Sequence, residues 1–531
     1  MKHFTLLKKM RVGIALIVLA LTLSLFLDLY ELLPTTIYNK IVWLQFVPSI
    51  LKFAQTTSFL AAGGFIVIMV MTLLMGRIYC STICPLGILQ DLISYLSKKI
   101  SHKKVFYKYQ KGHPVWRYII FSIMGIAMIS GTGSLIAWLD PYSLAGRFFT
   151  YLAEPAVTLI NNGSATVLEW ANLYTLKYIA LPHVSVTTLS VTLLLAVTIT
   201  LMAWKKGRFF CNTICPVGTG LGLISELSLL RIKFNPDNCT KCGKCAAVCK
   251  SECINIKNQK VDTSRCVNCY NCLLVCEDAA ITIGIKGPVK NRPEPTKKPA
   301  THHTNTSRRQ MLLTVISIVA GTKLYAVIQN HKKAKSNSHL TYNKRDHFAS
   351  PPGSGSINRF NNKCTACSLC ISACPTHVLQ PSVTQYGLAG FMQPFMDYNT
   401  SYCNFDCHIC GEVCPTGAII PLMLKEKQHT QLGKAIFLKE NCVVNTDGTN
   451  CGACAEHCPT KAVKMTPFKG QLLIPHVDQN ICIGCGACEY ACPVPAPYKA
   501  IYINGNNQHQ TAASPIVEEQ AEVGFEEDFP F

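Results

Sequence analysis

The sequence predicts an α-helical membrane bundle of four spans, joined to small α+β domains. Three observations predict this fold class: long apolar runs in the first half of the chain, a one-sided distribution of charge, and regularly spaced cysteines. The 531 residues are enough for about three or four domains. Only 15% of the residues are charged, against about a quarter in ordinary soluble domains, and 49% are hydrophobic. This composition excludes a mainly disordered chain.

Four apolar runs are long enough to cross a bilayer, which takes about 20 residues. They cover residues 12–33, 57–75, 118–139 and 184–204. The mixed segment 148–176 is predicted to be interfacial or extracytoplasmic. We therefore expect four spans, with one segment at or beyond the membrane surface.

The net charge of +21 comes from the first part of the chain. Residues 1–330 carry 35 Lys and Arg against 13 Asp and Glu, whereas residues 331–531 carry 15 against 16. The basic residues gather before the first run, between the second and third, and after the fourth. Cytoplasmic loops carry this excess, so both ends of the bundle are predicted in the cytoplasm. The charge thus indicates membrane orientation and no nucleic-acid partner.

A twelve-residue segment occurs twice, at 76–87 and 207–218, and each copy contains a Cys-x3-Cys-Pro element. The offset is 131 residues, and two predicted spans lie between the copies, so both keep the same orientation. The four cysteines are Cys80, Cys84, Cys211 and Cys215. Three hypotheses stay open for them: a metal or cluster site, a thiol–disulfide redox pair, or a structural role.

Six cysteine quartets follow the bundle. Four have the spacing x2, x2, x3, and they are Cys239, Cys242, Cys245, Cys249; Cys266, Cys269, Cys272, Cys276; Cys364, Cys367, Cys370, Cys374; and Cys482, Cys485, Cys488, Cys492. Two are variants, with x3, x2, x3 or x8, x2, x3, and they are Cys403, Cys407, Cys410, Cys414; and Cys442, Cys451, Cys454, Cys458. This spacing is typical of cysteines that hold [4Fe–4S] clusters, so we expect six clusters.

Other uses of the quartets fit less well. Zinc takes two separated cysteine pairs, and residues three apart in a tight loop do not form disulfides easily. The segment Cys403–His408 resembles a haem attachment site, but that motif has two residues between its cysteines. In the first two quartets the fourth cysteines are predicted to be exchanged: Cys276 completes the set of Cys239, Cys242 and Cys245, and Cys249 that of Cys266, Cys269 and Cys272. Cys253 is left as a spare thiol.

These motifs resemble two types of ferredoxin that are usually separate proteins. Residues 1–285 resemble NapH-type membrane ferredoxins in their four spans, two Cys-x3-Cys-Pro elements and two cluster motifs. Residues 305–505 resemble NapG or MauM-type ferredoxins in a twin-arginine-like motif at 307–313, four cluster motifs and the x8 gap after Cys442. The chain is thus similar to a fusion of both. The resemblance implies nested pairing in the second part, with the first quartet joined to the fourth and the second to the third.

The resemblance also implies a function, namely oxidation of membrane quinol and electron transfer to a periplasmic reductase or cytochrome. No quinol-binding residue can be named from the sequence. The expected organisation is a membrane domain at 1–230, a two-cluster domain at 231–285, a linker at 286–358 with a possible fifth span at 311–328, a four-cluster domain at 359–505 and an acidic tail at 506–531. In the bacterial inner membrane, residues 231–305 would be cytoplasmic and 331–531 periplasmic.

Two other functions stay open. Copper reductases and cytochrome-oxidase assembly factors also combine Cys-x3-Cys-Pro elements with ferredoxin motifs. The chain could also be a non-enzymatic scaffold in which clusters only stabilise the fold.

Overall fold

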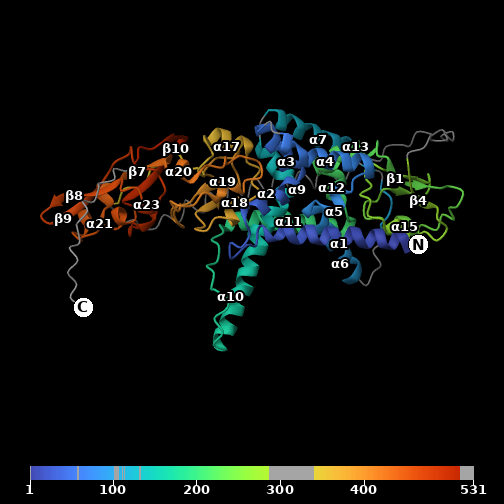
Figure 1. The fold of residues 1–531 in the computed structure, drawn as a ribbon, viewed down its shortest axis with the longest axis horizontal. Coiled ribbons are helices and arrows are strands. Elements are labelled where there is room, and N and C mark those ends of the chain that lie inside the picture. Colours follow the sequence, from blue (N-terminus) through green and yellow to red (C-terminus); the bar gives the residue numbers. More distant parts are fainter. Residues whose placement is uncertain are drawn as a thin grey trace, which may run out of the picture.

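The computed structural model describes residues 2–56, 59–100, 107–110, 112, 114–130, 133–285 and 340–514. The twin-arginine-like motif, the possible fifth span and most of the acidic tail lie outside the described residues. The described chain forms an elongated molecule of three regions in a row (Figure 1). A helix block (residues 2–229) lies in the middle, a small unit (230–285) at one end and a large unit (340–514) at the other.

Four apolar helices run through the helix block: α1 (Lys2–Ser24), α4 (Phe59–Met75), α7 (Pro114–Ile129) and α11 (Val186–Lys206). Among the described residues, only α11 has both the length and the apolar composition to cross a bilayer. Its apolar window has a mean hydropathy of 2.1 and is only 22% buried. The prediction of four full-length spans is therefore supported at α11 alone. The third predicted run is divided, because α7 ends at Ile129 and α8 (Gly133–Leu139) follows it.

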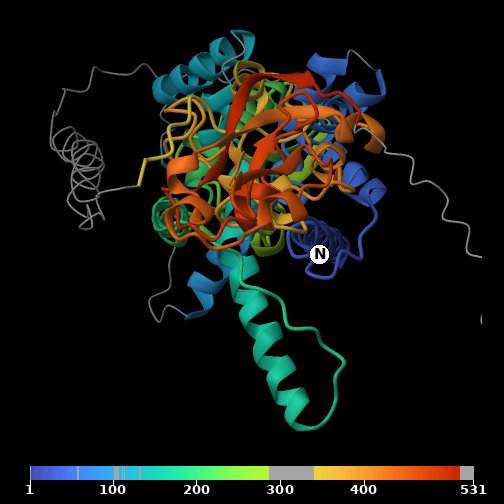
Figure 2. The same cartoon turned by 90° about the vertical axis from the view of Figure 1, so that its left-hand side faces the viewer.

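Shorter helices complete the block. They are α2 (Thr35–Trp43), α3 (Phe46–Thr56), α5 (Tyr79–Thr82), α6 (Pro85–Ile100), α8, α9 (Pro141–Phe148), the π-helical turn η1 (Phe149–Ala153), α10 (Glu154–Trp170), α12 (Phe209–Thr213) and α13 (Pro216–Ser225). Helix α10 projects out of the body across the long axis of the molecule, as Figures 1 and 2 show.

The two copies of the internal repeat fold alike. Each begins at a glycine with positive φ, 69° at Gly76 and 58° at Gly207, a conformation that residues with a Cβ rarely adopt. A short helix, α5 or α12, carries the first cysteine. The next helix, α6 or α13, starts at the proline after the second cysteine, where a missing N–H costs no helical hydrogen bond. Each Cys-x3-Cys-Pro element thus forms a corner between two helices.

The small unit is closed by the pairing of its first and last strands. Strand β1 (Leu230–Phe234) runs antiparallel to β4 (Ile281–Ile285), and β2 (Ile254–Asn255) pairs with β3 (Lys260–Val261). Helices α14 (Lys244–Ala247) and α15 (Asn271–Val275) pack together. Most of its apolar residues form a core cluster of their own, against which Phe4 and Leu7 of α1 pack, while Val267 joins the larger core of the rest of the molecule.

The large unit repeats this organisation twice. Its strand pairs are β5 (Leu379–Pro381) with β6 (Pro394–Met396), β7 (Thr430–Phe437) with β10 (Ile501–Thr511), and β8 (Val463–Lys469) with β9 (Leu472–Val477). Its helices are α17 (Ile357–Lys363), α18 (Leu369–Ser372), α19 (Ile409–Glu412), α20 (Leu424–Gln428), the 3-10 turn η2 (Lys439–Asn441), α21 (Val443–Thr446), α22 (Ala453–Glu456) and α23 (Ala487–Ala491). Helix α18 packs on α19, and α22 packs on α23. The unit is longer at both ends than the expected 359–505, because β10 continues to Thr511 and the Asn343 amide donates to the Lys499 carbonyl.

Candidate metal centres

The four regular quartets share one loop conformation. The second residue after the first cysteine and the residue after the second cysteine have positive φ in each: Lys241 and Gly243, Asn268 and Tyr270, Ala366 and Ser368, Gly484 and Gly486. This conformation turns backbone N–H groups toward sulfur. The Lys241 nitrogen lies 3.3 Å from Cys239 Sγ, and the Ala366 nitrogen 3.4 Å from Cys364 Sγ. The third cysteine of every quartet then stands on a short helix, and the fourth follows that helix.

Gly486 shows why small residues occupy these loops. A Cβ at this position would lie 1.9 Å from Cδ1 of Tyr398, whose hydroxyl donates to the Gly484 carbonyl at 2.6 Å. Only glycine combines this close approach with its φ of 82°. The backbone can therefore come close to the sulfurs, where its amides tune the potential of a bound cluster.

In the small unit the exchanged sets of cysteines surround two hollows. Site A, a hollow of about 150 Å³, is lined by Cys239, Cys242, Cys245 and Cys276. Site B is lined by Cys266, Cys269, Cys272 and Cys249. These are the sets that the spacing predicts, and the packing of α14 on α15 brings them together.

In the large unit the quartets pair in chain order, and the nested pairing implied by the resemblance is wrong. Sites D and F are hollows lined respectively by Cys403, Cys407, Cys410, Cys374 and by Cys442, Cys451, Cys454, Cys492. Cys414 and Cys458 lie near enough to influence the thiols of the two remaining sets, which we call site C (Cys364, Cys367, Cys370, Cys414) and site E (Cys482, Cys485, Cys488, Cys458). The reason is local: α18 packs on α19 and α22 on α23, so each quartet meets its neighbour in sequence.

The arrangement of the thiols suits clusters better than single ions. Within the described ranges, no three His, Cys, Asp or Glu side chains gather closely enough to hold one metal ion. A four-iron cube is held by four thiolates spread around it. Burial raises the pKa of Cys245 to about 11 and that of Cys454 and Cys485 to about 12. Bound metal would therefore have to replace the thiol protons.

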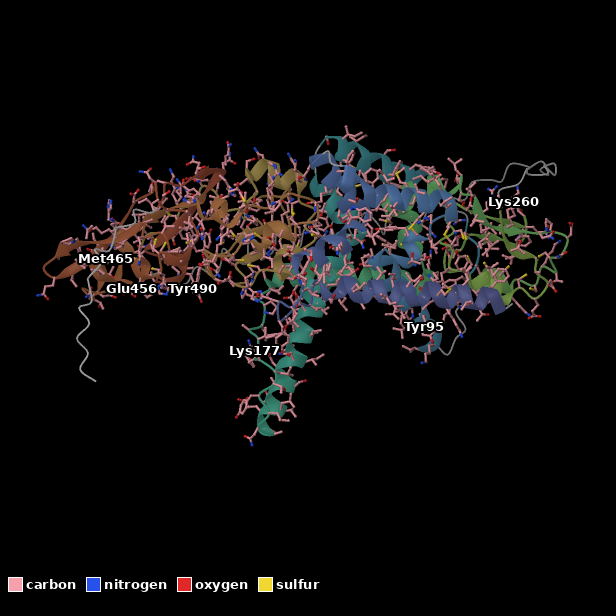
Figure 3. All side chains as sticks on the ribbon, in the orientation of Figure 1. Tyr95, Lys177, Lys260, Glu456, Met465 and Tyr490 are labelled. Carbon is pink, nitrogen blue, oxygen red and sulfur yellow. The ribbon has the colours of Figure 1, made fainter. Side chains whose placement is uncertain are left out.

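Sites C to F form a row that leads away from the helix block. Site C lies at the block, where the Ser368 hydroxyl donates to the Tyr151 hydroxyl at 3.0 Å. Site D meets site E through the Cys403 N–H, which donates to the Cys485 carbonyl at 2.9 Å. Site F follows at the outer end of the large unit, where Figure 3 labels Glu456 and Met465. Lys260 of the small unit is labelled at the opposite end of the molecule.

The two Cys-x3-Cys-Pro elements meet inside the helix block. Cys80, Cys84, Cys211 and Cys215, which we call the four-thiol site, are all buried. Burial raises the pKa of the Cys84 thiol, and the other three cysteines add to this, so the four sulfurs are close to one another. The repeats also cross over: Arg77 donates to the Cys211 carbonyl at 3.1 Å, and Arg208 to the Cys80 carbonyl at 2.6 Å.

Buried positive charge surrounds the four-thiol site. Arg208 pairs with Asp91 at 2.8 Å, whereas Arg77 has no carboxylate within ion-pair distance in the described part of the chain. Each guanidinium lies under 4 Å from a sulfur, at 3.8 Å from Cys80 Sγ for Arg77 and 3.7 Å from Cys211 Sγ for Arg208. A buried cation is costly unless an anion compensates it.

Buried hydrogen-bond donors without an acceptor also belong to residues beside the four-thiol site. Among the described residues, Arg77 Nε, Arg208 Nη2 and Gln90 Nε2 are buried and have no acceptor. Four thiolates around an iron–sulfur cluster would supply the missing negative charge, so the residues fit such a group. The cysteine pattern does not indicate either arginine, although Arg77 and Arg208 occupy the same position in the two repeats.

Two further predictions from the sequence concern single residues. Cys253 is buried, with its Sγ 3.5 Å from Cys249 Sγ beside site B. Cys403 and Cys407 line site D, as expected of cluster ligands, and the neighbouring His408 faces Glu412, with 3.0 Å between Nε2 and Oε1.

Comparisons with known proteins agree with these sites. The family described as "4Fe-4S binding domain" matches residues 57–104 and 189–235, which contain the two Cys-x3-Cys-Pro elements. The family described as "4Fe-4S dicluster domain" matches residues 363–418 and 449–496. These two segments separate sites C and D from sites E and F, in agreement with pairing in chain order. No solved structure matches the chain.

Three curated relatives cover about a quarter of the chain each. The ferredoxin-type protein NapF of Escherichia coli is 30% identical over 146 residues, which are 28% of this chain and 80% of NapF. The methylamine utilization ferredoxin-type protein MauM of Methylobacillus flagellatus is 33% identical over 148 residues, or 27% of this chain. The chain spans 62% of the length of that MauM protein. The ferredoxin-type protein NapG of E. coli is 28% identical over 156 residues, which are 28% of this chain and 67% of NapG.

Repeated ligand sets for [4Fe–4S] clusters define an iron–sulfur electron-transfer protein. The chain belongs to the family of ferredoxin-type 4Fe–4S polyferredoxins that includes NapF, NapG and MauM.

Proposed function

We propose that this protein is a membrane-bound electron carrier that oxidises quinol and passes the electrons through [4Fe–4S] clusters to a redox protein at the outer face of a bacterial inner membrane. The row of sites C to F carries the proposal, because it starts at the apolar helix block and ends at the exposed tip of the large unit. Quinol dissolves in the membrane, and clusters accept one electron at a time. The resemblance of residues 1–285 to NapH-type proteins favours the same function.

The predicted orientation of the loops supports this topology. The loops at 34–56 and 140–183 are poor in basic residues, and both contact the large unit, through Gln55 to the Thr416 carbonyl and through Tyr151 to Ser368. The basic loops contact the small unit, where Lys250 pairs with Asp91 at 3.4 Å. The small unit would therefore be cytoplasmic and the large unit periplasmic. At 1.5 Å per residue, α4 and α7 would be about 25 Å long, a little less than the hydrocarbon thickness of about 30 Å.

We also infer that the four-thiol site holds an iron–sulfur cluster that links the two ends, as a seventh centre beside sites A to F. Toward the small unit, Asn212 next to Cys211 donates to the Ser251 carbonyl at 3.2 Å, two residues from Cys249 of site B. Toward the large unit, buried Tyr79 and Tyr142 flank Asp140, and Tyr142 lies near Cys367 of site C. A centre here would divide the path across the membrane into two shorter steps.

The quinol function is tested with the purified full chain in lipid nanodiscs. We expect dithionite to bleach the visible absorbance of the clusters and menadiol, a soluble quinol, to bleach a large part of it within seconds. Bleaching by dithionite without any by menadiol would contradict quinol oxidation.

The topology is tested with alkaline phosphatase, which is active only in the periplasm. Fused after Ser514, it should be active, and fused after Ile285 of a truncated chain, it should be inactive. An inactive fusion at Ser514 would place the large unit in the cytoplasm.

A further inference from the structure

A cavity of about 570 Å³ lies where the helix block meets the large unit. This volume is within the range of about 300–1,000 Å³ that small-molecule sites occupy. One wall comes from the chain after α1 and from α10, and the opposite wall from the large unit. The lining includes Phe26, Asp28, Tyr38, Glu154, Ile179 and Cys374.

The cavity opens beside a segment suited to a membrane surface. Helix α10 projects from the body, and the chain returns along it to the cavity, where Figure 3 labels Lys177. Asn162 fixes this return segment by bonding both the carbonyl of Ile179, at 2.7 Å, and its N–H, at 3.0 Å. The hairpin exposes large apolar side chains, with Trp170 at 86% and Tyr174 at 76%. Tryptophan and tyrosine favour the membrane interface, so an apolar ligand could enter here from the lipid.

The polar groups of the cavity are suited to a ligand that donates protons, because they can accept them. Glu154 is buried, and its Oε2 has no hydrogen-bond partner among the described residues. Burial raises the pKa of Glu154 to about 8. The Tyr38 hydroxyl donates to Asp28 Oδ2 at 3.3 Å. Phe26 and Ile179 add apolar surface between these polar groups.

The cavity also borders site D, a candidate cluster site. Cys374, Pro375 and Ile409 line both this cavity and the hollow of site D, so the two spaces are adjacent. Proton acceptors and a cluster ligand therefore face one space that lipid-soluble molecules can reach.

We propose that this cavity is the quinol-oxidation site, with Glu154 as the acceptor of a quinol proton and site D as the first electron acceptor. Each quinol breaks both O–H bonds and leaves as quinone. Its two electrons reduce two oxidised clusters by one electron each, at site D and then along the row. One proton goes to the Glu154 carboxylate and the other to water at the cavity mouth. This inference rests on the proposed function and assigns the acceptance of a quinol proton to Glu154.

The pH dependence follows from Glu154. Its carboxyl must be ionised to accept a proton, so the rate of reduction by quinol should rise with pH up to about 8. The other charged or titratable side chains that line the cavity are Asp28, Tyr30, Glu31, Tyr38, Lys177, Tyr178, Cys374 and His377. These side chains are unchanged in a Glu154 variant. If the rise in rate toward pH 8 is lost in that variant, the rise is due to Glu154.

The test is stopped-flow reduction of the full chain in nanodiscs by menadiol, with dithionite as the reference reductant. Glu154→Gln keeps the size of the side chain, and we expect about 100-fold slower reduction by menadiol, without the rise toward pH 8. Ala180→Trp fills the cavity from an exposed lining position, and we expect at least tenfold weaker binding of oxidised menadione, measured by fluorescence quenching. The matched controls are Glu169→Gln on the same helix and Ala171→Trp, both exposed and outside the cavity lining.

The outcomes separate the two proposals. If menadiol does not reduce the wild-type chain although dithionite does, the quinol function fails. If menadiol reduces the wild type, Glu154→Gln and Ala180→Trp at equal rates, quinol oxidation stands and this cavity is not its site. Unchanged iron content and dithionite bleaching in both variants show that the clusters are intact.

Discussion

The small unit and the large unit meet the helix block through different kinds of contact. The junction of the small unit is polar: the Arg208 N–H donates to the Lys250 carbonyl, Arg77 to the Ser264 carbonyl, both at 2.9 Å, and Asn268 to the Met75 carbonyl. The junction of the large unit combines the hydrogen bonds of Gln55 and Tyr151 with an extended apolar contact, in which Trp138 stacks on Phe391 and one core is continuous across it.

The two units also differ in how far they cover their cysteines. Cys242 of site A is exposed, and Cys239 and Cys276 are partly exposed, whereas in the large unit only Cys407 and Cys451 are not buried. Buried clusters exclude water, and exposed ones can pass electrons to a soluble partner. The large unit therefore holds an insulated row of sites next to the cavity at the helix block, and the small unit holds an exposed site.

The largest expected effect comes from interrupting the row. Cys485→Ser removes a ligand of site E and should lose about four iron atoms per chain, together with electron transfer from menadiol to site F. Electron paramagnetic resonance of the reduced protein measures the second effect. Cys458→Ser should give the same spectrum, because it belongs to the same site. A match between Cys374→Ser and Cys485→Ser instead would restore the nested pairing.

The four-thiol site gives the next largest effect. The double variant Cys84→Ser and Cys215→Ser should also lose about four iron atoms, and it should stop electrons from reaching sites A and B while sites C to F are still reduced by menadiol. Iron analysis and resonance spectra measure both. Cys253→Ala is the control for iron content alone, because this buried thiol belongs to none of the proposed sets although it lies beside Cys249 of site B. Equal iron content in the double variant and the wild type would mean that the four-thiol site binds no cluster and has a structural role.

The polar junction should be weaker in acid. Burial alone would raise the pKa of Asp91, but Arg208, Lys250 and Arg11 outweigh burial and hold it well below its usual range. A lowered pKa contributes stability above the ordinary value near 3.8, and this stability is lost as the pH falls further. Asp91→Asn should cost about 3 kcal/mol at neutral pH, because it leaves buried Arg208 without its partner.

Thermal unfolding followed by circular dichroism in detergent measures this loss. The acid-induced decrease in the midpoint should be smaller in Asp91→Asn than in the wild type. Equal acid sensitivity would show that Asp91 does not hold the junction.

The smallest effect is expected at the exposed surface of the small unit. Lys244 and Glu277 form an ion pair at 2.8 Å, with side chains 56% and 72% exposed. Solvent and salt screen such a pair, so Lys244→Gln should leave the unfolding midpoint and the iron content within error of the wild type. A clear loss of iron in this variant would mean that site A depends on its surface charge.

The cysteine spacing predicted the local structure around the metal sites. The spacing x2, x2, x3 is enough for the left-handed loop and the short helix, because both form within about a dozen residues. The nested pairing failed for the opposite reason: which fourth cysteine completes a site depends on the packing of α18 on α19 and of α22 on α23. The length of α7 was also overestimated, since apolar composition continues past Ile129 although the helix does not.

By itself, the sequence determined the cysteine spacing, the repeat and the class of protein, since these depend on residue types at short spacing. Only the tertiary structure decided what lies between distant segments. It brought Cys80 and Cys84 to Cys211 and Cys215 across 131 residues, placed two buried arginines beside them, and set Glu154 opposite Cys374 around one cavity. In the sequence, Asp28 and Glu31 are charged residues near the end of the predicted span 12–33. In the fold they line the cavity, because the chain after α1 turns away from the helix axis to meet the large unit.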